Sequence, residues 1–320
     1  MCKFGMLLAL FWALLSPPSD SVRIMFWNLE NFFDWRADST STSELEFSSH
    51  GERHWTRKRF AAKSNAVAKG ILWTASGQGA LPDVIGLAEI ENKHVIKRLL
   101  QDTALRKLDY GIIHFDSPDP RGIDVAMLYR TSRLRLQSAK PCHLSAADTL
   151  LRTRDILLAH FTDGHGTDIA VLVNHHPSKY GGTAVSEPKR KVAVQRLRYL
   201  ADSLNNLGIS RIVAIGDFND TPDNPLYRQL DSTFLNLGLP LSQKGEGSIK
   251  YDGAWELIDL IFVTPSCKAK TMKIIRIPFL MVEDRQHGGL KPFRTYSGPR
   301  YLGGVSDHCP IWVDIPVGNF

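Results

Sequence analysis

The sequence predicts an α/β protein in which sheets pack face to face and helices cover the outer faces. Three observations carry this prediction: many short apolar runs of strand length, a few longer segments with helical spacing, and no repeat or low-complexity linker along the chain. The length of 320 residues alone fits one large domain or two ordinary ones. Since nothing marks a boundary between domains, we expect a single domain.

Eight short runs predict buried strands, because they are bounded by Gly, Pro, Asn or Asp and many are rich in Val and Ile. They cover residues 22–27, 83–88, 123–129, 156–161, 169–173, 212–215, 257–263 and 311–315. The polar segments 39–53 and 283–304 are expected to be long loops, which in a compact domain are usually functional or disordered.

Three segments are predicted to be helices. The first follows Thr56, a good N-cap residue, and the second is capped by Ser186, with Pro188 tolerated in its first turn. A shorter helix is expected over 92–102. The apolar faces of the two longer helices repeat at helical spacing: Phe60, Ser64, Val67 and Ile71 in the first, and Ala193, Leu197, Leu200 and Leu204 in the second.

The N-terminus matches a secretory signal peptide. One lysine precedes an apolar run over 4–15, and small and turn-forming residues follow. This run is too short to cross a bilayer, which takes about twenty residues. We therefore expect a signal peptide at 1–21 and a single domain at 22–320, exported to the periplasm or the extracellular space, monomeric and without stable membrane insertion.

The net charge indicates which kinds of partner to expect, and the cysteine content indicates whether to expect disulfides or a zinc site. The net charge of +6 and the pI near 9.1 favour polyanionic partners such as nucleic acid, phosphorylated small molecules or an anionic surface, and an ordinary basic surface stays open. Cys142, Cys267 and Cys309 remain after removal of the signal peptide. Their odd number and wide spacing predict neither a disulfide framework nor a zinc site, and leave one disulfide open.

The clearest chemical signal is the segment RIVAIGDFNDTP at 211–222. Its apolar strand runs directly into Asp217, Phe218 and Asn219. Because side chains alternate along a strand, the Asp217 carboxylate and the Asn219 amide are expected on one side and Phe218 on the other. Such a pair could hold one water or one phosphate oxygen; the alternative is an ordinary Asx-turn.

Five other strand-end segments carry similar polar groups. They contain Asn28 and Glu30; Glu89 and Glu91; Asn174, His175 and His176; Asp259; and Asp307 and His308. Six segments that each deliver Asn, Asp, Glu or His to a strand end are hard to explain as caps alone. We therefore predict that folding gathers these groups into one pocket. His176 and Glu91 receive no role, and Glu91 is expected to be solvated at the surface.

These motifs, in this order, resemble the endonuclease/exonuclease/phosphatase superfamily, which includes pancreatic-type deoxyribonucleases, abasic-site endonucleases, neutral sphingomyelinases and inositol polyphosphate phosphatases. The resemblance runs from WNLEN to SDHCPIW, with GDFN and SDH as its most specific motifs and LAE and VNHHP in support. PRGIDVAMLYR, WELIDLIFV and YLGGVSDH look closest to exported bacterial members. The resemblance implies a four-layer α/β sandwich, two mixed sheets flanked by helices, and metal-dependent phosphoester hydrolysis.

The resemblance implies a metal site. By matched motif, Glu89 is the principal ligand with Asn28 beside it, Asp307 lies near the metal or the phosphate, and Glu30 stands where some members have an acidic ligand. Mg²⁺ prefers oxygen ligands and often uses only one or two carboxylates, whereas zinc would require more His and Cys. We therefore expect Mg²⁺, with Mn²⁺ as a substitute.

The resemblance also implies catalytic roles. Asp217 matches the residue that orients or deprotonates the attacking water, and Asn219 would hold water or phosphate. His308 matches the histidine that contacts the scissile phosphate. Asp259 would fix its orientation and favour its charged form. His175 matches a position that stabilises the phosphate or the leaving oxygen.

Two more residues are candidates for contact with the substrate phosphate. Arg121 precedes a predicted strand, where its guanidinium could bind a phosphate or form a surface salt bridge, with Asp124 as a candidate partner. Asn174 ends another strand. The segment 285–301 interleaves basic and aromatic residues, which suits phosphate contact with base stacking and also suits a solvated loop.

The leading hypothesis from the sequence is an exported Mg²⁺-dependent phosphodiesterase, and within that class a nuclease acting on DNA or RNA. A phosphatase or a phospholipid or inositol-phosphate phosphodiesterase is the enzymatic alternative. An alternative of another class is a non-catalytic binding protein on the same fold. The expected partner is nucleic acid or another phosphoester substrate.

Overall fold

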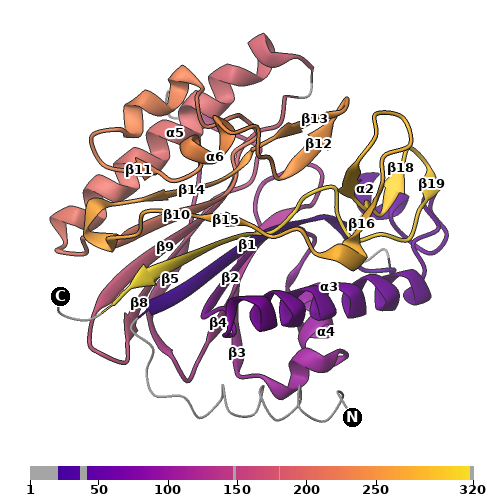
Figure 1. Ribbon diagram of the computed structural model, residues 1–320, viewed down its shortest axis with the longest axis horizontal. Helices are drawn as coiled ribbons and strands as arrows, with labels where there is room; N and C mark the ends of the chain where they lie inside the picture. Colours follow the sequence, from indigo (N-terminus) through magenta and orange to yellow (C-terminus); the bar gives the residue numbers. More distant parts are fainter. Residues whose placement is uncertain (1–20, 37–41, 147–148, 180, 318–320) are drawn as a thin grey trace.

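The computed structural model describes residues 21–36, 42–146, 149–179 and 181–317. Two six-stranded mixed sheets pack face to face, with helices on the outer face of each, which confirms the predicted α/β four-layer sandwich (Figure 1). The segment expected to be a signal peptide lies, apart from its last residue, outside the described residues. Within the described ranges, no helix has both the length and the apolar character needed to cross a membrane.

In the first sheet, two central parallel strands carry predicted site residues at their carboxyl ends. β1 pairs in parallel with β2 and antiparallel with β20, so the end of β1 lies at the same edge as the start of β20. The strand order is β15 (Lys273–Ile274), β20 (Ile311–Pro316), β1 (Ser21–Phe32), β2 (Val84–Ile90), β4 (Asp124–Arg130) and β3 (Tyr110–His114).

The second sheet repeats this arrangement. β10 pairs in parallel with β9 and antiparallel with β14, and this register places Asp217 beside both His175 and Asp259. The strand order is β11 (Leu235–Asn236), β14 (Asp259–Val263), β10 (Ile212–Asp217), β9 (Asp168–His175), β8 (Ile156–Asp163) and β5 (Leu134–Cys142). All eight predicted strands are present, and several extend further than the apolar runs.

The three predicted helices are present. α3 (Arg57–Gln78) follows Thr56, whose hydroxyl accepts a hydrogen bond from the Arg59 amide as a cap. α4 (Lys93–Gln101) follows the cap residue Asn92. α5 (Thr183–Asn206) begins before the predicted cap, so that prediction is wrong: the Ser186 hydroxyl donates to the Gly182 carbonyl inside the helix, and Pro188 lies beyond the first turn.

Short elements occupy the segments that were predicted to be loops. α2 (Thr42–Glu46) interrupts the first of them, and small hairpins interrupt the second. Among the described residues, four two-stranded hairpins lie outside the two large sheets: β6 (Ser145–Ala146) with β7 (Thr149–Leu150), β12 (Ile249–Tyr251) with β13 (Ala254–Glu256), β16 (Met281–Glu283) with β17 (Leu290–Pro292), and β18 (Tyr296–Ser297) with β19 (Arg300–Tyr301). The remaining short helices are η1 (Ala104–Lys107), η2 (Pro225–Leu230), α6 (Leu239–Ser242), η3 (Pro265–Cys267) and η4 (Pro278–Leu280).

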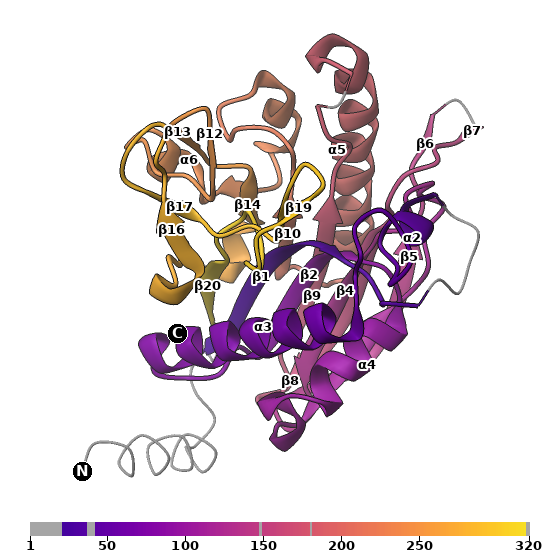
Figure 2. The ribbon, with the colours of Figure 1, turned by 90° about the vertical axis from the view of Figure 1, so that its right-hand side faces the viewer.

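The core has two parts, one on each face of the first sheet. Ile24 and Phe26 of β1 belong to the cluster between the two sheets and under α5, whereas Met25 and Trp27 belong to the cluster under α3 and α4. Figure 2 shows α3 and α4 together on one side of the sheets and α5 away from them. Buried Cys142, Cys267 and Cys309 are all free, so the question of a disulfide is answered. The core therefore fixes the strands, and with them one polar edge.

Candidate active site

The predicted site residues meet where the carboxyl ends of β1, β2, β9 and β10 adjoin the beginnings of β14 and β20. Three of their side chains leave backbone positions with left-handed φ: Glu30 at 47°, Glu89 at 60° and Asn219 at 53°. The pairing of β1 with β2 is irregular around Glu30, and the pairing of β2 with β4 is irregular around Glu89. Such backbone costs on the order of 1–3 kcal/mol per residue and persists where surrounding contacts require it. Side-chain direction at this edge is thus set by irregular backbone as well as by alternation.

Asp217 lies at the centre of the site and is buried. Its Oδ2 accepts a hydrogen bond from the Asn28 amide at 3.0 Å and lies 3.6 Å from His175 Nε2 and 3.9 Å from His308 Nε2. Burial raises the pKa of Asp217 to about 7, against the opposing attraction of the charged His308. A carboxyl group with that pKa can accept a proton near neutral pH.

His308 forms an ion pair with Asp259, as predicted. Its Nδ1 lies 2.8 Å from Asp259 Oδ2 and donates a hydrogen bond to it. Burial alone would lower the pKa of His308, but the carboxylates of Asp259, Asp217 and Asp307 raise it well above its ordinary value. The imidazole is therefore charged near neutral pH and presents Nε2 to the pocket.

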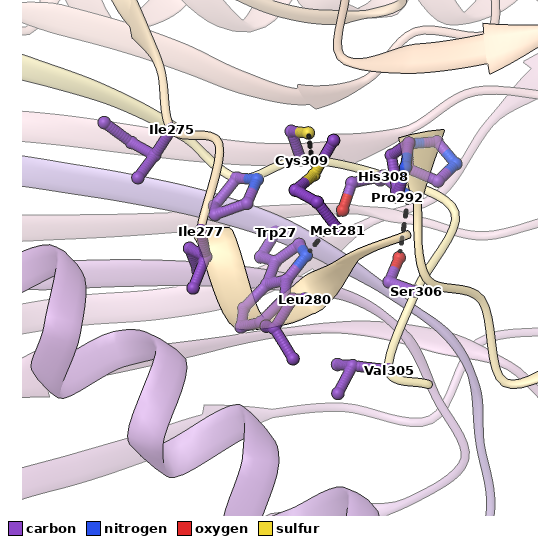
Figure 3. Close-up of a pocket in the computed structure, with 11 residues that line it drawn as sticks. Trp27, Ile275, Ile277, Leu280, Met281, Pro292, Val305, Ser306, His308 and Cys309 are labelled. Atoms are coloured by element: carbon purple, nitrogen blue, oxygen red, sulfur yellow. Dashed lines mark hydrogen bonds between the residues drawn. The ribbon is translucent and has the colours of Figure 1, made fainter. Parts of the chain in front are cut away.

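Hydrogen bonds with the side chains of Trp27 and Ser306 fix the backbone around His308. The Trp27 indole donates to the His308 carbonyl at 2.9 Å, and the Ser306 hydroxyl accepts from the His308 amide at 2.9 Å (Figure 3). The same hydroxyl donates to the Asn28 carbonyl at 2.6 Å. Apolar side chains enclose a space of only about 10 Å³ here, so this region supports the histidine and is too small to bind a ligand.

His175 has the opposite electrostatic character. It is buried, and burial together with the charges of Arg154 and Arg121 lowers its pKa well below the ordinary value. Its Nε2 lies 4.0 Å from Glu89 Oε1, and its Nδ1 has no hydrogen-bond partner in the described part of the chain. His175 is thus a neutral imidazole between two carboxylates.

Glu89 faces the same pocket from β2. Its Oε2 accepts a hydrogen bond from the Asn31 amide at 2.7 Å, and Oε1 lies 3.5 Å from the Asn28 side-chain nitrogen. The Asn28 side-chain nitrogen thus bridges Glu89 and Asp217, while its side-chain oxygen accepts from the Glu30 amide. Asn31 belongs to the WNLEN motif but had no predicted role.

Glu30 points toward the segment before β20. Its buried carboxylate accepts hydrogen bonds from the Thr295 amide at 2.6 Å and from Arg294 Nε at 3.3 Å. Burial, followed by the nearby Asp307, raises the pKa of Glu30 to about 7. Lys63 donates to the Glu30 carbonyl, and burial lowers the pKa of Lys63 to about 8. Glu30 therefore anchors 294–296, in addition to its predicted role near the metal.

The donor set fits a hard divalent cation. Glu89, Glu30 and Asp307 all act electrostatically on Lys63 and Arg294, and all three come from this strand-end edge. Asp307 is more than a third exposed and pairs with Arg294 at 3.1 Å. Asp217, Asp259 and His308 also lie close enough for one atom of each to share an ion, although the ion pair already accounts for two of them. Carboxylate oxygens with few nitrogen donors suit Mg²⁺ or Mn²⁺.

Two phosphate-binding candidates lie in different environments. The Arg121 side chain is 43 % exposed, donates to the Asn31 side chain at 2.9 Å and lies 3.8 Å from Glu89 Oε2, at the rim of the site. Asn174 is fully buried and donates to the carbonyls of Leu172 and Ile215. It does not face the pocket, because its side chain points into the sheet, and we assign it a structural role.

For the segment that carries Asn219, the sequence left two alternatives open: an Asx-turn, or a pair of polar groups that holds water or phosphate. The backbone amide of Asn219 donates to Asp217 Oδ1 at 2.9 Å, which is an Asx-turn, and its side-chain nitrogen donates to the His176 carbonyl at 2.9 Å. Phe218 is buried on the opposite side, as predicted. The Asx-turn fixes the carboxylate and places the Asn219 amide next to it.

Two local predictions are wrong. Asp124 does not pair with Arg121: it accepts hydrogen bonds from Ser117 and lies 3.1 Å from His114 Nε2. Glu91 is not solvated, because it is buried and accepts a hydrogen bond from the Asp34 amide. Both carboxylates stabilise loops near the site.

A buried ion pair that sequence reasoning missed connects the two sides of the site. Arg154 donates to Asp119 Oδ2 at 3.0 Å and to the His176 carbonyl at 2.7 Å. Asp119 also accepts from the Arg121 amide, and the His176 carbonyl also accepts from Asn219. Arg154 thus links the Arg121 loop to the Asp217 turn. No motif marks it, since only tertiary contacts identify its partners.

Comparison with known proteins agrees with this fold. Residues 23–316 match the Endonuclease/Exonuclease/phosphatase family. A solved endonuclease/exonuclease/phosphatase family protein from Bacteroides thetaiotaomicron is 17 % identical, with a TM-score of 0.59 over 95 % of this chain and 100 % of that chain. No curated protein matches the sequence significantly.

Two further similar structures have more specific titles. D. rerio TDP2, solved with a single strand DNA product, is 14 % identical with a TM-score of 0.53, over 92 % of this chain and 99 % of that one. The mannosyl-6-phosphatase of Bacteroides thetaiotaomicron is 17 % identical with a TM-score of 0.56, over 92 % and 98 %. At these identities the structures show a shared fold. Because the family match covers nearly all of the described chain, the chain belongs to the endonuclease/exonuclease/phosphatase family, whose members hydrolyse phosphoester bonds.

Proposed function

We propose that the protein is an exported, Mg²⁺-dependent phosphodiesterase that acts on nucleic acid. The observation that carries the proposal is a charged His308, held by Asp259, facing the carboxyl group of Asp217 across 3.9 Å. The two groups face one pocket. The imidazolium can donate a hydrogen bond to an anionic phosphate, and the carboxyl group, whose pKa is raised, can accept a proton from water. Both groups serve the hydrolysis of a phosphodiester, one by stabilising charge and the other by accepting a proton.

In this proposal Asp217 accepts the proton of the attacking water, a step typically worth about 10²–10⁴-fold in rate. Its Oδ1 is fixed by the Asn219 amide and its Oδ2 by the Asn28 side chain, so the carboxylate is oriented before substrate arrives. His308 donates a charge-assisted hydrogen bond to the phosphate. Neutral His175 lies beside Asp217 and donates to the phosphate or the leaving oxygen.

Glu89, with Asp307 and the Asn28 and Glu30 region beside it, would hold Mg²⁺, with Mn²⁺ as a substitute. A bound divalent ion supplies charge neutralisation at the phosphoryl oxygens. Arg121 at the rim adds a guanidinium that can bind a phosphate oxygen. These roles follow from the donor types and their grouping around one pocket.

Nucleic acid is the proposed substrate for two reasons. The net charge of +6 favours polyanionic partners. A structural relative, D. rerio TDP2, was solved with a single strand DNA product.

For the signal-peptide pattern at 1–21 we propose cleavage and export, which N-terminal sequencing of the secreted protein tests. We further propose that the protein is a monomer, which light scattering tests.

The test is hydrolysis of single-stranded DNA, double-stranded DNA, RNA and bis(p-nitrophenyl) phosphate with Mg²⁺, with Mn²⁺ or with EDTA. We expect turnover of at least one nucleic acid and of the small diester with either metal, and none with EDTA. No turnover of any phosphoester in the presence of metal would leave only the non-catalytic binding protein.

A phosphatase is the second candidate, favoured by the likeness to the mannosyl-6-phosphatase of Bacteroides thetaiotaomicron. Release of inorganic phosphate from mannose 6-phosphate and from inositol phosphates distinguishes it from the nuclease. A phosphomonoesterase would hydrolyse these substrates faster than bis(p-nitrophenyl) phosphate.

A further inference from the structure

A groove of about 760 Å³ begins at Asp307 and His308 and extends away from the strand ends. Its walls are the hairpins β12–β13 and β16–β17 and the segment that carries β18 and β19. Figure 1 shows these hairpins gathered on one side of the molecule, coloured orange to yellow. Substrate bound at His308 therefore has room to continue in this direction.

The groove is basic, and most of its cations already have partners. Lys250 and Lys291 each lie 3.1 Å from a carboxylate oxygen of Asp284, and Arg294 pairs with Glu30 and Asp307. These cations stabilise the hairpins. Their charges are largely balanced within the wall, so they contribute little net attraction to a ligand.

Arg285 and Arg300 are different, because both are exposed and line the groove. Within the described residues neither guanidinium pairs with a carboxylate, although Glu283 also lines the groove. A guanidinium presents a planar set of donors that matches a phosphate group. These two side chains are thus available to an anionic ligand, at a distance from His308 set by the hairpins.

One aromatic ring in the groove is also available. Tyr251 is 69 % exposed and lies at the end of β12. The position of this strand is fixed, because Ile249 forms a β-bridge with His308 and Gly253, in the following turn, packs so closely on His287 that a Cβ there would lie 2.9 Å away. A rigid hairpin therefore presents the ring to the groove.

The other tyrosines of this segment are engaged elsewhere. Tyr296 packs against Phe47, Trp55 and Tyr301 in an aromatic cluster, and Arg59 lies over the Tyr301 ring. From the sequence we expected 285–301 to supply both the basic and the aromatic contacts. In the structure this segment supplies the exposed arginines, and the exposed ring is Tyr251 of β12.

We propose that this groove binds a single strand of nucleic acid beside the scissile phosphodiester, with Arg285 and Arg300 each on a neighbouring phosphate and Tyr251 stacked on a base. The inference rests on the proposed phosphodiesterase function and specifies its substrate as single-stranded. Stacking on an exposed ring requires an unpaired base, and two free guanidinium groups favour more than one phosphate. A duplex keeps its bases inside and cannot use Tyr251.

The test measures binding and turnover separately. Binding is followed by fluorescence anisotropy of a labelled single-stranded oligonucleotide of about ten nucleotides, with EDTA present to prevent hydrolysis. We expect Arg285→Ala and Arg300→Ala each to raise Kd about threefold, because water screens exposed guanidinium groups. Each should also reduce the slope of log Kd against log salt by about 0.7. Tyr251→Ala should raise Kd about tenfold, while Tyr251→Phe keeps the ring and the affinity.

The matched control is Arg106→Ala, an exposed arginine in η1 at the other end of the first sheet, which should leave Kd unchanged. With metal present, the groove variants should hydrolyse bis(p-nitrophenyl) phosphate like the wild type, because that substrate does not reach Arg285 or Tyr251. Only KM for the oligonucleotide should rise.

Three results would overturn the inference. They are an unchanged Kd in the Arg285→Ala/Arg300→Ala double variant and in Tyr251→Ala, equal affinity of the wild type for duplex and single strand, and displacement of the oligonucleotide by an equal concentration of fructose 1,6-bisphosphate. If the wild type cleaves the small diester and the variants still bind the oligonucleotide like the wild type, the groove inference is wrong and the proposed function stands. If no phosphoester is cleaved but the variants lose affinity, the proposed function fails and the groove remains as a binding site.

Discussion

The strand-end edge and the hairpin wall of the groove differ in how their charges are used. At the edge, Asp217 and Asp259 are buried, the His308 side chain is only 10 % exposed, and the three lie within 4 Å of one another in a chain of contacts. On the wall, Arg285 and Arg300 are exposed and unpaired among the described residues. Buried, mutually oriented groups suit chemistry, because they need no reorganisation in the transition state. Exposed donors suit attraction of an anionic ligand.

Two histidines within the edge sharpen this contrast. Each lies near Asp217, yet the pKa of His308 is raised and that of His175 is lowered. The difference is Asp259, which pairs directly with His308, whereas burial and then the charges of Arg154 and Arg121 lower the pKa of His175. One fold thus provides an acid and a neutral imidazole from the same residue type.

The largest expected effect is at the centre of the edge. Asp217→Asn removes the proton acceptor and His308→Ala removes the charged donor, so each should lower kcat for a phosphodiester at least about a hundredfold. Exposed residues of the same types provide the controls, Asp223→Asn and His165→Ala, which should keep wild-type rates. Circular dichroism checks that each variant is folded. Near-wild-type turnover in either site variant would remove the basis for its assigned role.

A smaller effect is expected from Asp259→Asn, together with a change in pH dependence. Activity that needs charged His308 falls as pH rises through its folded-state pKa, which Asp259 holds well above 6.5. Without that carboxylate, burial still disfavours the charged form, so the pKa falls and the alkaline limb of the rate profile moves to lower pH. We expect about a tenfold loss at pH 8. A pH–rate profile with an unmoved alkaline limb would contradict this role.

Asn174→Ala should affect stability and leave catalysis alone. The change removes the donor to two buried carbonyls, which should lower the free energy of unfolding by about 1–3 kcal/mol. Urea denaturation measures the loss, and kcat per folded molecule should be unchanged. Asn65→Ala, in an exposed position on α3, should change stability by less than about 0.5 kcal/mol. A large fall in kcat for Asn174→Ala would return this residue to the substrate-binding group.

The smallest expected effect is at the rim. Arg121→Ala removes a half-exposed guanidinium, which water screens, so KM for a phosphodiester should rise only about threefold while kcat stays within twofold. Initial-rate kinetics at several salt concentrations measure this effect, with Arg106→Ala as the control. A loss as large as that of His308→Ala would place Arg121 with the buried groups.

Much of the fold was predictable from local patterns. All eight apolar runs became strands, and Phe60, Val67, Leu197 and Leu200 are buried on their helices as their spacing predicted. The cap of α5 was not predictable from Ser186, because glycines at 181 and 182 allow the helix to start earlier. Asp124 and Glu91 were wrongly assigned, since their partners come from other segments whose position relative to them the sequence does not reveal.

The sequence by itself determined the family, the strands and the set of polar residues at their ends, because apolar runs and short motifs are local signals. The tertiary structure decided which of those residues face one another. Left-handed backbone at Glu30 and Glu89 redirects their side chains, the sheet register sets His175 and Asp259 on either side of Asp217, and folding leaves Asn174 in the core. Such outcomes depend on contacts between residues far apart in the chain, and their energies have no signature in any one segment.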